Sequence, residues 1–457
     1  MDSQPERQND AAADAAARSD PLRSLALGVF VTFGIRIYGA VLQYLTQLYL
    51  ARTIFAEQVG IYAFAWTVVT LLAFLTPLGF DTSIVRFLPE DLARQSWGRV
   101  HGLLRLSQRT TIGYSVVAAL FTAAFVLGVD RALDSHYSIA LLLGVAMIPV
   151  LGLLNLYQGI ARGFHWVLSV AGPSYFLRPT IFFVGAWVAI EVFQQRTGEA
   201  MVVAALAACV LTLIPLVIGM RRHVPARVRA AAPIEDAKLW RRTSLPMMLV
   251  ASFELLVANT DILMMGLIRG PGETGVYNIA VRTSSSLLFM FFAMTSFAAP
   301  RIAEHYGRGE RDALLRFAAK MRLLAALPTC AGALVLVLVG RMLFELFGEE
   351  FSGAYLPCLV LTAGVVCRTL AGPSDSLLTM TGRERQLALV LAIACFVNIA
   401  LNALLIPFFG GNGAAFATLT SVVVEVLMIA TLAGKHIGFR PFLFTPTRGG
   451  HEQRGKS

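Results

Sequence analysis

Two acidic residues, Glu254 and Asp261, lie inside an apolar run, LPMMLVASFELLVANTDILMMGLI. They are seven residues apart, so a helix would carry them on one face about two turns apart. The next apolar run adds Asn278, Arg282 and Ser285 at i, i+4 and i+7, which forms a second polar stripe. A charge at the centre of a membrane helix costs roughly 2.5 to 3.5 kcal/mol on insertion scales, so such residues face protein or water. This stretch predicts a polar cavity inside a membrane protein.

Four arginines also fall inside apolar runs, on four different predicted helices: Arg36, Arg178, Arg282 and Arg368. One interpretation is that they form ion pairs that lock helices together. The acidic candidates for such pairs are Asp81, Glu254, Asp261, Asp375 and Glu425. The other interpretation is a cationic cavity whose guanidinium groups bind a diphosphate bidentately. The spread of the arginines over both halves of the chain favours a shared cavity.

Apolar helices must position these residues. The chain has 457 residues, of which 56% are hydrophobic and 14% charged, and its mean hydropathy is +0.67. That composition indicates an all-α polytopic membrane protein, since a helix needs about 20 apolar residues to cross roughly 30 Å of hydrocarbon. About twelve spans are predicted, at residues 25–50, 60–83, 110–129, 138–160, 168–191, 200–219, 244–268, 275–298, 322–341, 354–379, 386–407 and 413–434.

An internal repeat divides these spans into two sets of six. A shift of 215 residues aligns Gly60 with Gly275 and Tyr62 with Tyr277. Because six is even, both halves enter the membrane in the same direction, as parallel repeats around a central cavity. The predicted organisation is a disordered tail (1–24), a six-helix bundle (25–220), a basic cytoplasmic linker (221–243), a second bundle (244–434) and a tail (435–457).

The net charge of +10 is distributed by topology and does not indicate nucleic-acid binding. Of the 38 Lys and Arg residues, 29 fall in the tails and in the loops on one side of the predicted helices. This asymmetry predicts that both termini are cytoplasmic. The first twenty residues lack the apolar core of a cleavable signal peptide, so the tail is expected to be retained.

Nothing in the sequence indicates an enzyme, a metal site or a cofactor. There is no HExxH, no GxSxG and no Cys/His cluster with zinc spacing. The five cysteines lie in apolar spans and are interpreted as core residues. The terminal string GHEQRGKS matches the Walker A pattern, but it lacks the strand and helix that a P-loop requires.

Several stretches resemble the polysaccharide biosynthesis, or oligosaccharide flippase, branch of the multidrug/oligosaccharidyl-lipid/polysaccharide exporter superfamily. They are DILMMGLIRGPGETGVYNIAVRTSSSLLFMFFAMTSFAAPRIAEHYGRGE, LARTIFAEQVGIYAFAWTVVTLLAFLTPLGFDTSIVRFLPE, FGEEFSGAYLPCLVL and NIALNALLIPFFGGNGAAFATLTS. The resemblance implies a flippase of the bacterial inner membrane. It would move polyprenyl-diphosphate-linked oligosaccharides outward for lipopolysaccharide or exopolysaccharide synthesis, alongside membrane lipids and polymerase machinery.

On this chain the resemblance assigns substrate binding to Arg36 and Arg282, and less directly to Arg178 and Arg368. Two polar residues complete the predicted set: Gln43, seven residues after Arg36 and therefore on the same face of the first span, and Asn278, on the stripe of the eighth span. If transport is coupled to H+ or Na+, the expected residues are Asp261 and Glu254, because a carboxylate in a low-dielectric site takes up a proton more readily than one in water.

Two other functions compete with this interpretation. A small-molecule (drug) exporter of the same superfamily would want an acidic cavity for organic cations, which four arginines do not favour. A polysaccharide polymerase or ligase would be an enzyme with a large outer loop. The outer loops expected here are only about ten residues long, so this alternative is the weaker one.

Overall fold

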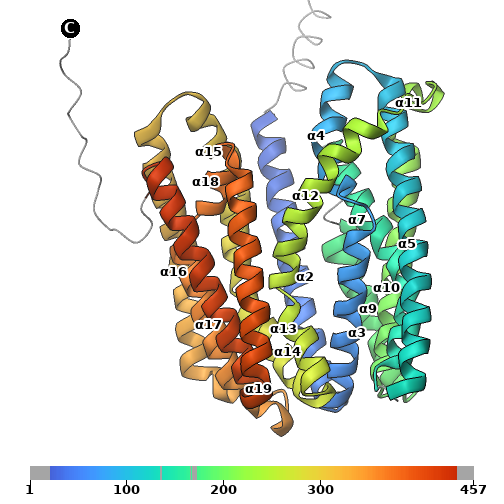
Figure 1. The fold of residues 1–457 in the computed structure, drawn as a ribbon, viewed down its shortest axis with the longest axis vertical. Helices are drawn as coiled ribbons and strands as arrows, with labels where there is room; N and C mark the ends of the chain where they lie inside the picture. The colour runs from blue at the N-terminus through green and yellow to red at the C-terminus, as the bar shows by residue number, and fades with distance from the viewer. Residues whose placement is uncertain (1–20, 134–135, 165, 167–171, 440–457) are drawn as a thin grey trace, which may run out of the picture. The chain divides into compact units, whose positions relative to one another are not determined.

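The computed structural model describes residues 21–133, 136–164, 166 and 172–439. Helices and the turns between them make up this part of the chain, and it contains no strand (Figure 1). Packing divides the chain into two units, Met1–Ile54 with Val68–Leu249, and Phe55–Thr67 with Val250–Ser457. The predicted tails lie almost wholly outside the described residues. The all-α fold predicted from composition is confirmed.

The first unit is built mainly from the earlier helices. They are α2 (Pro21–Thr53), the later part of α3 (Ala56–Leu75), α4 (Phe80–Ala93), α5 (Trp97–Leu133), α6 (Ser138–Val145), α7 (Met147–Gly163), the π-helix η1 (Gly172–Leu177), α9 (Arg178–Trp187), the π-helix η2 (Val188–Val192), α10 (Gly198–His223), α11 (Ala226–Ala230) and the start of α12 (Ala237–Val257).

The second unit takes the start of α3, the end of α12 and all later helices. These are α13 (Thr260–Ile268), α14 (Pro271–Ser286), α15 (Leu288–Gly307), α16 (Arg311–Glu345), the 3-10 helix η3 (Glu349–Ala354), α17 (Tyr355–Leu370), α18 (Ser374–Met380) and α19 (Glu384–His436).

Every predicted span has a helical counterpart. Within the described residues, seven helices are long and apolar enough to cross a membrane, or nine if two bent pairs each form one span. The 53-residue α19 covers two predicted spans and is interrupted at Gly410, whose backbone (φ 53°, ψ −133°) is not helical. The total of twelve spans is consistent with these helices and stays a prediction.

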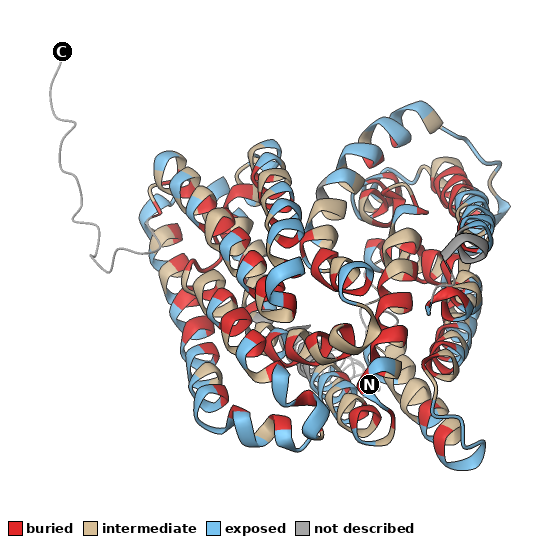
Figure 2. Cartoon of the chain, turned by 60° about the horizontal axis from the view of Figure 1, so that its bottom comes forward, coloured by how far each residue is buried: buried red, intermediate tan, exposed pale blue. Residues whose placement is uncertain are grey.

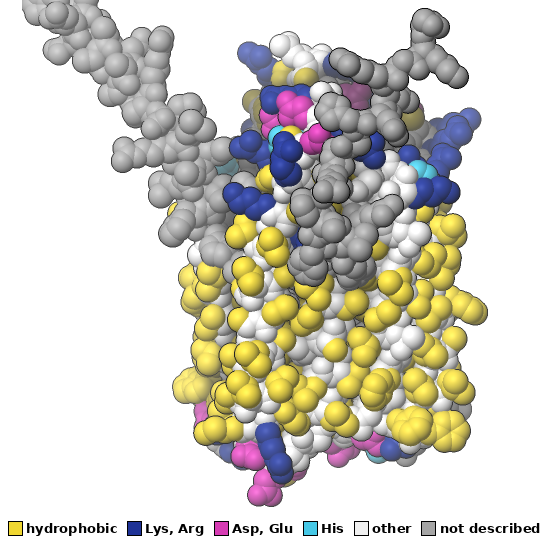
Figure 3. Space-filling view, turned by 90° about the vertical axis from the view of Figure 1, so that its left-hand side faces the viewer, with side chains coloured by type: hydrophobic (Ala, Val, Ile, Leu, Met, Phe, Trp, Pro, Cys, Tyr) yellow, Lys and Arg dark blue, Asp and Glu magenta, His cyan; other side chains and the backbone are white. Residues whose placement is uncertain are grey.

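Burial follows the faces of the helices. In each unit the buried residues lie where a helix meets its neighbours, and exposed residues lie on the opposite face (Figure 2). Many of these exposed residues are large and apolar, such as Phe121 (72% exposed), Leu338 (73%) and Phe408 (76%). On the face drawn in Figure 3, apolar side chains form a broad band with Lys and Arg gathered above it. Such apolar exposure fits lipid as the surrounding solvent.

The start of α3 crosses α14 at two glycines, which places both backbones in close contact. A Cβ at Gly60 would lie 1.8 Å from the Pro271 carbonyl oxygen, and a Cβ at Gly275 would lie 1.9 Å from the Ala56 carbonyl oxygen. Since no real Cβ tolerates such distances, only glycine allows this crossing. The carboxylate of Glu350 accepts a hydrogen bond of 2.9 Å from the Ala56 amide and so caps the start of α3.

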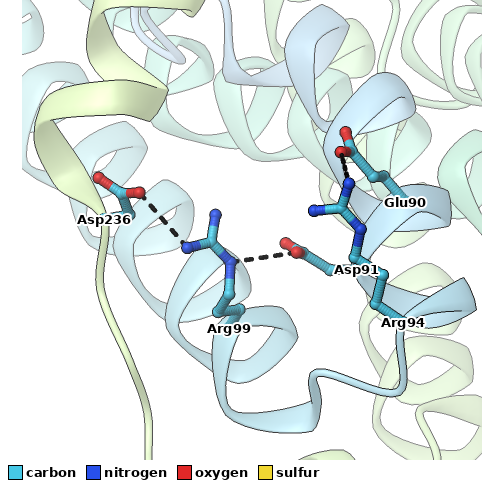
Figure 4. Close-up of polar contacts among 5 residues, drawn as sticks. All are labelled: Glu90, Asp91, Arg94, Arg99 and Asp236. Carbon is cyan, nitrogen blue, oxygen red and sulfur yellow. Dashed lines mark hydrogen bonds and ion pairs between the residues drawn. The ribbon is translucent and has the colours of Figure 1, made fainter.

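The segment predicted as a linker is docked on the first unit. Arg99, in the first turn of α5, donates to Asp91 (3.1 Å) and to Asp236 (3.4 Å), which precedes α12 (Figure 4). The Ile234 amide donates to the Gly98 carbonyl oxygen at 2.9 Å. The Trp240 side chain is fully buried in the core of the unit. These contacts hold the start of α12 against α5.

Candidate functional site

A cavity of about 360 Å³ in the second unit collects the ionisable residues of its helices. Its ionisable lining comes from five helices: Glu254 (α12), Asp261 (α13), Arg368 (α17), Asp375 (α18) and Glu425 (α19). Hydroxyl groups, that of Thr418 among them, add to the polar lining. Apolar side chains, among them Leu288, Phe291 and Leu361, complete the wall. Polar groups converging in an otherwise apolar cavity are typical of a binding site.

Asp261 is held at the start of α13 by donors from three helices. Its side chain is 2% exposed. One carboxylate oxygen accepts from the Ile262 amide (2.8 Å), and the other accepts from the Tyr277 hydroxyl (2.7 Å) and, weakly, from Thr418 (3.5 Å). The charge of Arg282, on α14, also interacts with it. A negative charge in the first turn of a helix is stabilised by the helix dipole.

The polar contacts extend beyond Asp261 into α19. Thr418 accepts a hydrogen bond from the Asn398 amide (3.3 Å), and Asn402 donates to the Asn398 side-chain oxygen (2.9 Å). Both asparagines are fully buried. Sequence reasoning missed Asn398, Asn402 and the role of Tyr277. The usable signals were an i, i+4 asparagine pair inside an apolar run and a tyrosine that the internal repeat conserves.

A second group surrounds Arg368. One guanidinium nitrogen lies 3.2 Å from a carboxylate oxygen of Glu425 and 3.6 Å from one of Asp375. Glu254 is close enough for its charge to act on Arg368 as well. Glu425 is 1% exposed, and its second carboxylate oxygen has no hydrogen-bond partner among the described residues. This group matches the ion-pair interpretation of the intramembrane arginines.

The cavity within the second unit is therefore acidic. Four carboxylates line it against the single guanidinium of Arg368. Within the described part of the chain, no group of three or more His, Cys, Asp or Glu side chains has the arrangement of a metal site. The arrangement can hold and exchange a proton or a small cation, because its carboxylates are only partly neutralised.

The remaining predicted site residues lie elsewhere. Arg36, on α2, is half-buried, and its guanidinium carbon lies 5.2 Å from the centre of the Tyr175 ring. Gln43 is exposed on the same helix, and Arg178 begins α9. Asn278 is buried beside Tyr277, with no partner for its side-chain oxygen among the described residues. Arg36, Gln43 and Arg178 belong to the first unit, and Arg282 and Arg368 to the second.

The model of the family described as "Polysaccharide biosynthesis protein" matches residues 25–305, more than half of the chain. The chain belongs to this family. A second family model, MatE, matches residues 246–404, which include most of the cavity lining. The two matches confirm the resemblance, and together with the relatives and solved structures below they indicate a transporter instead of a catalyst.

Relatives and solved structures agree with this assignment. The chain is 20% identical to the probable low-salt glycan biosynthesis flippase Agl15 of Haloferax volcanii, covering 89% of this chain and 83% of the relative. It is 25% identical to the probable flippase AglR of the same organism, over 40% of this chain and 39% of that one.

Two solved transporters share the fold. An inward-facing multidrug resistance MATE family transporter superposes with a TM-score of 0.74, covering 87% of this chain and 94% of that one at 11% identity. A MOP superfamily transporter from Pyrococcus furiosus has a TM-score of 0.66, with 90% and 95% covered at 12% identity. This similarity shows the two-bundle fold of a multi-pass membrane transporter.

Proposed function

We propose that the protein is a flippase that moves a polyprenyl-diphosphate-linked oligosaccharide from the cytoplasmic to the outer leaflet for surface polysaccharide synthesis. The observation that carries the proposal is the family match over residues 25–305. A relative named as a glycan biosynthesis flippase, aligned over 89% of the chain, supports it. The product would pass to polysaccharide polymerase machinery.

The proposed orientation places both termini in the cytoplasm of a bacterial cell, where 29 of the 38 Lys and Arg residues would lie. This orientation supplies a driving force. A diphosphate with about two negative charges gains roughly 2.3 kcal/mol per charge on leaving a cytoplasm at about −100 mV, or about 5 kcal/mol in all. The membrane potential alone can therefore bias transport outward.

We assign recognition of the diphosphate to Arg36, Arg178, Arg282 and Arg368, with Gln43 and Asn278 as polar neighbours. Guanidinium groups suit this role because they bind phosphate oxygens bidentately. Arg282 supports the assignment in one respect: among the described residues no carboxylate forms an ion pair or hydrogen bond with it, and Asp261 acts on it only through charge. Arg368 is shared with two carboxylates and has the weakest support.

The acidic cavity is proposed as the site of ion coupling, with Asp261 and Glu254 as the residues that take up H+ or Na+. Asp261 is buried and Glu254 is exposed on the cavity wall. One ion could therefore reach the outer carboxylate from water and stabilise the inner one. No cofactor is required by this scheme.

The acidic lining also supports a second candidate function, an ion-coupled drug exporter of the same superfamily. Four carboxylates in one cavity suit an organic cation better than they suit a diphosphate. In this case Arg368 would serve as the ion-pair partner of Glu425 and Asp375.

Complementation separates the two functions. The wild-type chain is expressed in a strain that lacks its own polyprenyl-diphosphate oligosaccharide flippase, beside Arg36→Ala and Arg282→Ala at matched membrane abundance. The exposed Arg227→Ala serves as the control. We expect the wild type and the control to restore surface polysaccharide and the other two variants to fail. Drug resistance without polysaccharide would refute the flippase and support the exporter.

Ion coupling is tested separately in proteoliposomes. Asp261→Asn and Glu254→Gln should reduce transport and flatten its dependence on pH or on Na+. If both variants transport like the wild type across the same range, the acidic cavity has no part in coupling.

A further inference from the structure

A separate cavity of about 300 Å³ lies within the first unit, at the end that carries α11 and the start of α5. Three arginines from three helices line it: Arg105 (α5), Arg221 (α10) and Arg229 (α11). Its other lining residues are His101, Leu104, Gln108, Tyr157, Val217, Met220, Val224 and Val228. A cavity that combines guanidinium groups with apolar side chains suits an amphipathic anion.

Within the part of the chain that the structure describes, the three arginines have no anionic partner. Among the described residues, none of them forms an ion pair or hydrogen bond with a carboxylate, whereas the nearby Arg99 is bound by Asp91 and Asp236. The His101 ring donates through Nδ1 to the Ala231 carbonyl oxygen at 2.7 Å and so ties the segment after α11 to α5. Three guanidinium groups held around one cavity repel one another, and a bound anion would relieve that repulsion.

A cavity in the second unit offers a contrast. It lies among α15, α16 and the ends of α19, and it is also rich in basic residues. There, however, two of the four basic side chains are engaged: Arg311 donates to the Ile437 carbonyl oxygen (3.1 Å) and His305 bonds to Glu310 (2.8 Å). Among the described residues, this cavity therefore has one arginine without an acceptor, Arg383, whereas the cavity in the first unit has three.

Apolar stripes lead away from the arginines along two helices. On α10, Leu211, Ile214 and Ile218 are 49%, 48% and 44% exposed and share a face with Arg221 at helical spacing. On α5, Ile112 and Val116 are 48% and 45% exposed and continue the face of Arg105. Such stripes can bind acyl chains, whereas they would contribute nothing to the binding of a soluble anion.

We propose that this cavity binds the phosphate headgroup of an anionic phospholipid, with the acyl chains along the exposed faces of α5 and α10. The guanidinium groups of Arg105, Arg221 and Arg229 bind the phosphate oxygens. On the proposed topology the lipid belongs to the cytoplasmic leaflet. The site is distinct from the transport residues assigned above, and the inference does not depend on which substrate is transported.

The test uses the purified full-length chain in detergent with added lipid. Thermal stability is titrated with phosphatidylglycerol, with phosphatidylcholine and with inorganic phosphate. The variant Arg105→Gln/Arg221→Gln/Arg229→Gln is compared with Arg109→Gln/Arg222→Gln/Arg227→Gln, which removes one exposed arginine from each of the same helices without touching the cavity. Both variants lose three positive charges, so they differ only in position.

We expect phosphatidylglycerol to stabilise the wild type and the control variant at the same concentrations. At about 1 kcal/mol for each basic residue at an anionic surface, the cavity variant should need about a hundredfold more. Equal weakening of both variants would overturn the proposal, because it would indicate general surface charge. The same holds if phosphatidylcholine or inorganic phosphate protects the wild type as well as phosphatidylglycerol does. A short-chain prenyl diphosphate that competes at lower concentration would replace the phospholipid with the transported lipid class.

A cavity-filling variant, Val217→Trp, keeps the proposal testable if the triple variant does not fold. It leaves all three arginines in place and should abolish the preference for phosphatidylglycerol over phosphatidylcholine. An unchanged preference would mean that the lipid binds elsewhere.

Discussion

Removing Arg368 should destabilise the second unit more than any exposed arginine does. The substitution Arg368→Gln leaves Glu425 and Asp375 without the guanidinium that lies 3.2 and 3.6 Å from them. At an effective dielectric constant of about 20, Coulomb's law gives about 5 kcal/mol for each pair, most of which is offset by desolvation. Breaking a buried pair costs about 3 to 5 kcal/mol.

We expect the lower end of that range, about 3 kcal/mol, because the Arg368 side chain is 27% exposed and water screens it. For a unit of this size the loss corresponds to a Tm lower by roughly 6 to 12 °C. The double variant Arg368→Gln/Glu425→Gln should recover most of it, since the deeply buried carboxylate is removed as well. Arg308→Gln, whose partner Glu304 is also exposed, should change Tm by less than about 2 °C.

The assay is thermal unfolding of the purified chain in one detergent, followed by transport in the complementing strain. The reasoning is refuted if Arg368→Gln unfolds at the same temperature as the wild type. It is also refuted if the double variant loses as much stability as Arg368→Gln and Glu425→Gln lose together. A double variant that is stable and active would make Arg368 a partner of Glu425 alone. One that is stable but inactive would support its assignment to the diphosphate.

Three further predictions test the fold around the two sites. Gly60→Ala should lower the free energy of unfolding by at least about 3 kcal/mol, or prevent folding, because the added Cβ meets backbone. The control Gly272→Ala adds a Cβ with nothing within 4 Å and should leave thermal unfolding unchanged. Arg99→Gln leaves the Asp91 carboxylate, which is 6% exposed, without its partner. It should lower the free energy of unfolding by about 2 kcal/mol and speed tryptic cleavage of residues 221–243. The control Arg94→Gln, in an exposed pair, should lower it by less than about 0.5 kcal/mol. Tyr277→Phe removes the 2.7 Å donor to the buried carboxylate at the start of α13 and should cost about 1 to 3 kcal/mol in the same measurement, with packing unchanged.

Helix positions could be predicted from the sequence because apolar length determines which segments span a membrane. Breaks within helices could not. Glu254 and Asp261 line one cavity, as their spacing suggested, yet the helix between them bends by 52°. The side chains of Asn259 and Thr260 bond to the carbonyl oxygens of Leu255 and Leu256 at this break. Short polar side chains of this kind compete with the regular helix, and that competition is decided by packing.

The partners of the charged residues show the same division between local and tertiary information. Arg368 and Asp375 are seven apart, a spacing that would place them on one face of a continuous helix. In the structure α17 ends before Pro373 and α18 starts at Ser374, but the two side chains still meet at 3.6 Å. The closer contact, to Glu425, comes from α19, 57 residues further along the chain than Arg368. No spacing rule reaches that far, so the acidic character of this cavity was visible only in three dimensions.

The internal repeat aligns two glycines that lie at the same tertiary contact. The shift of 215 residues pairs Gly60 with Gly275, and by the same shift Ala56 with Pro271. In the crossing of α3 and α14, Gly60 faces the carbonyl oxygen of Pro271, and Gly275 faces the carbonyl oxygen of Ala56. The second contact is the first one with each residue replaced by its equivalent in the other repeat. A local two-fold axis produces such a pair of contacts. Because the axis brings each copy against the other, the crossing needs glycine in both. A side chain in either copy would separate α14, which carries the Tyr277 hydroxyl that donates to Asp261, from α3, whose first amide donates to Glu350.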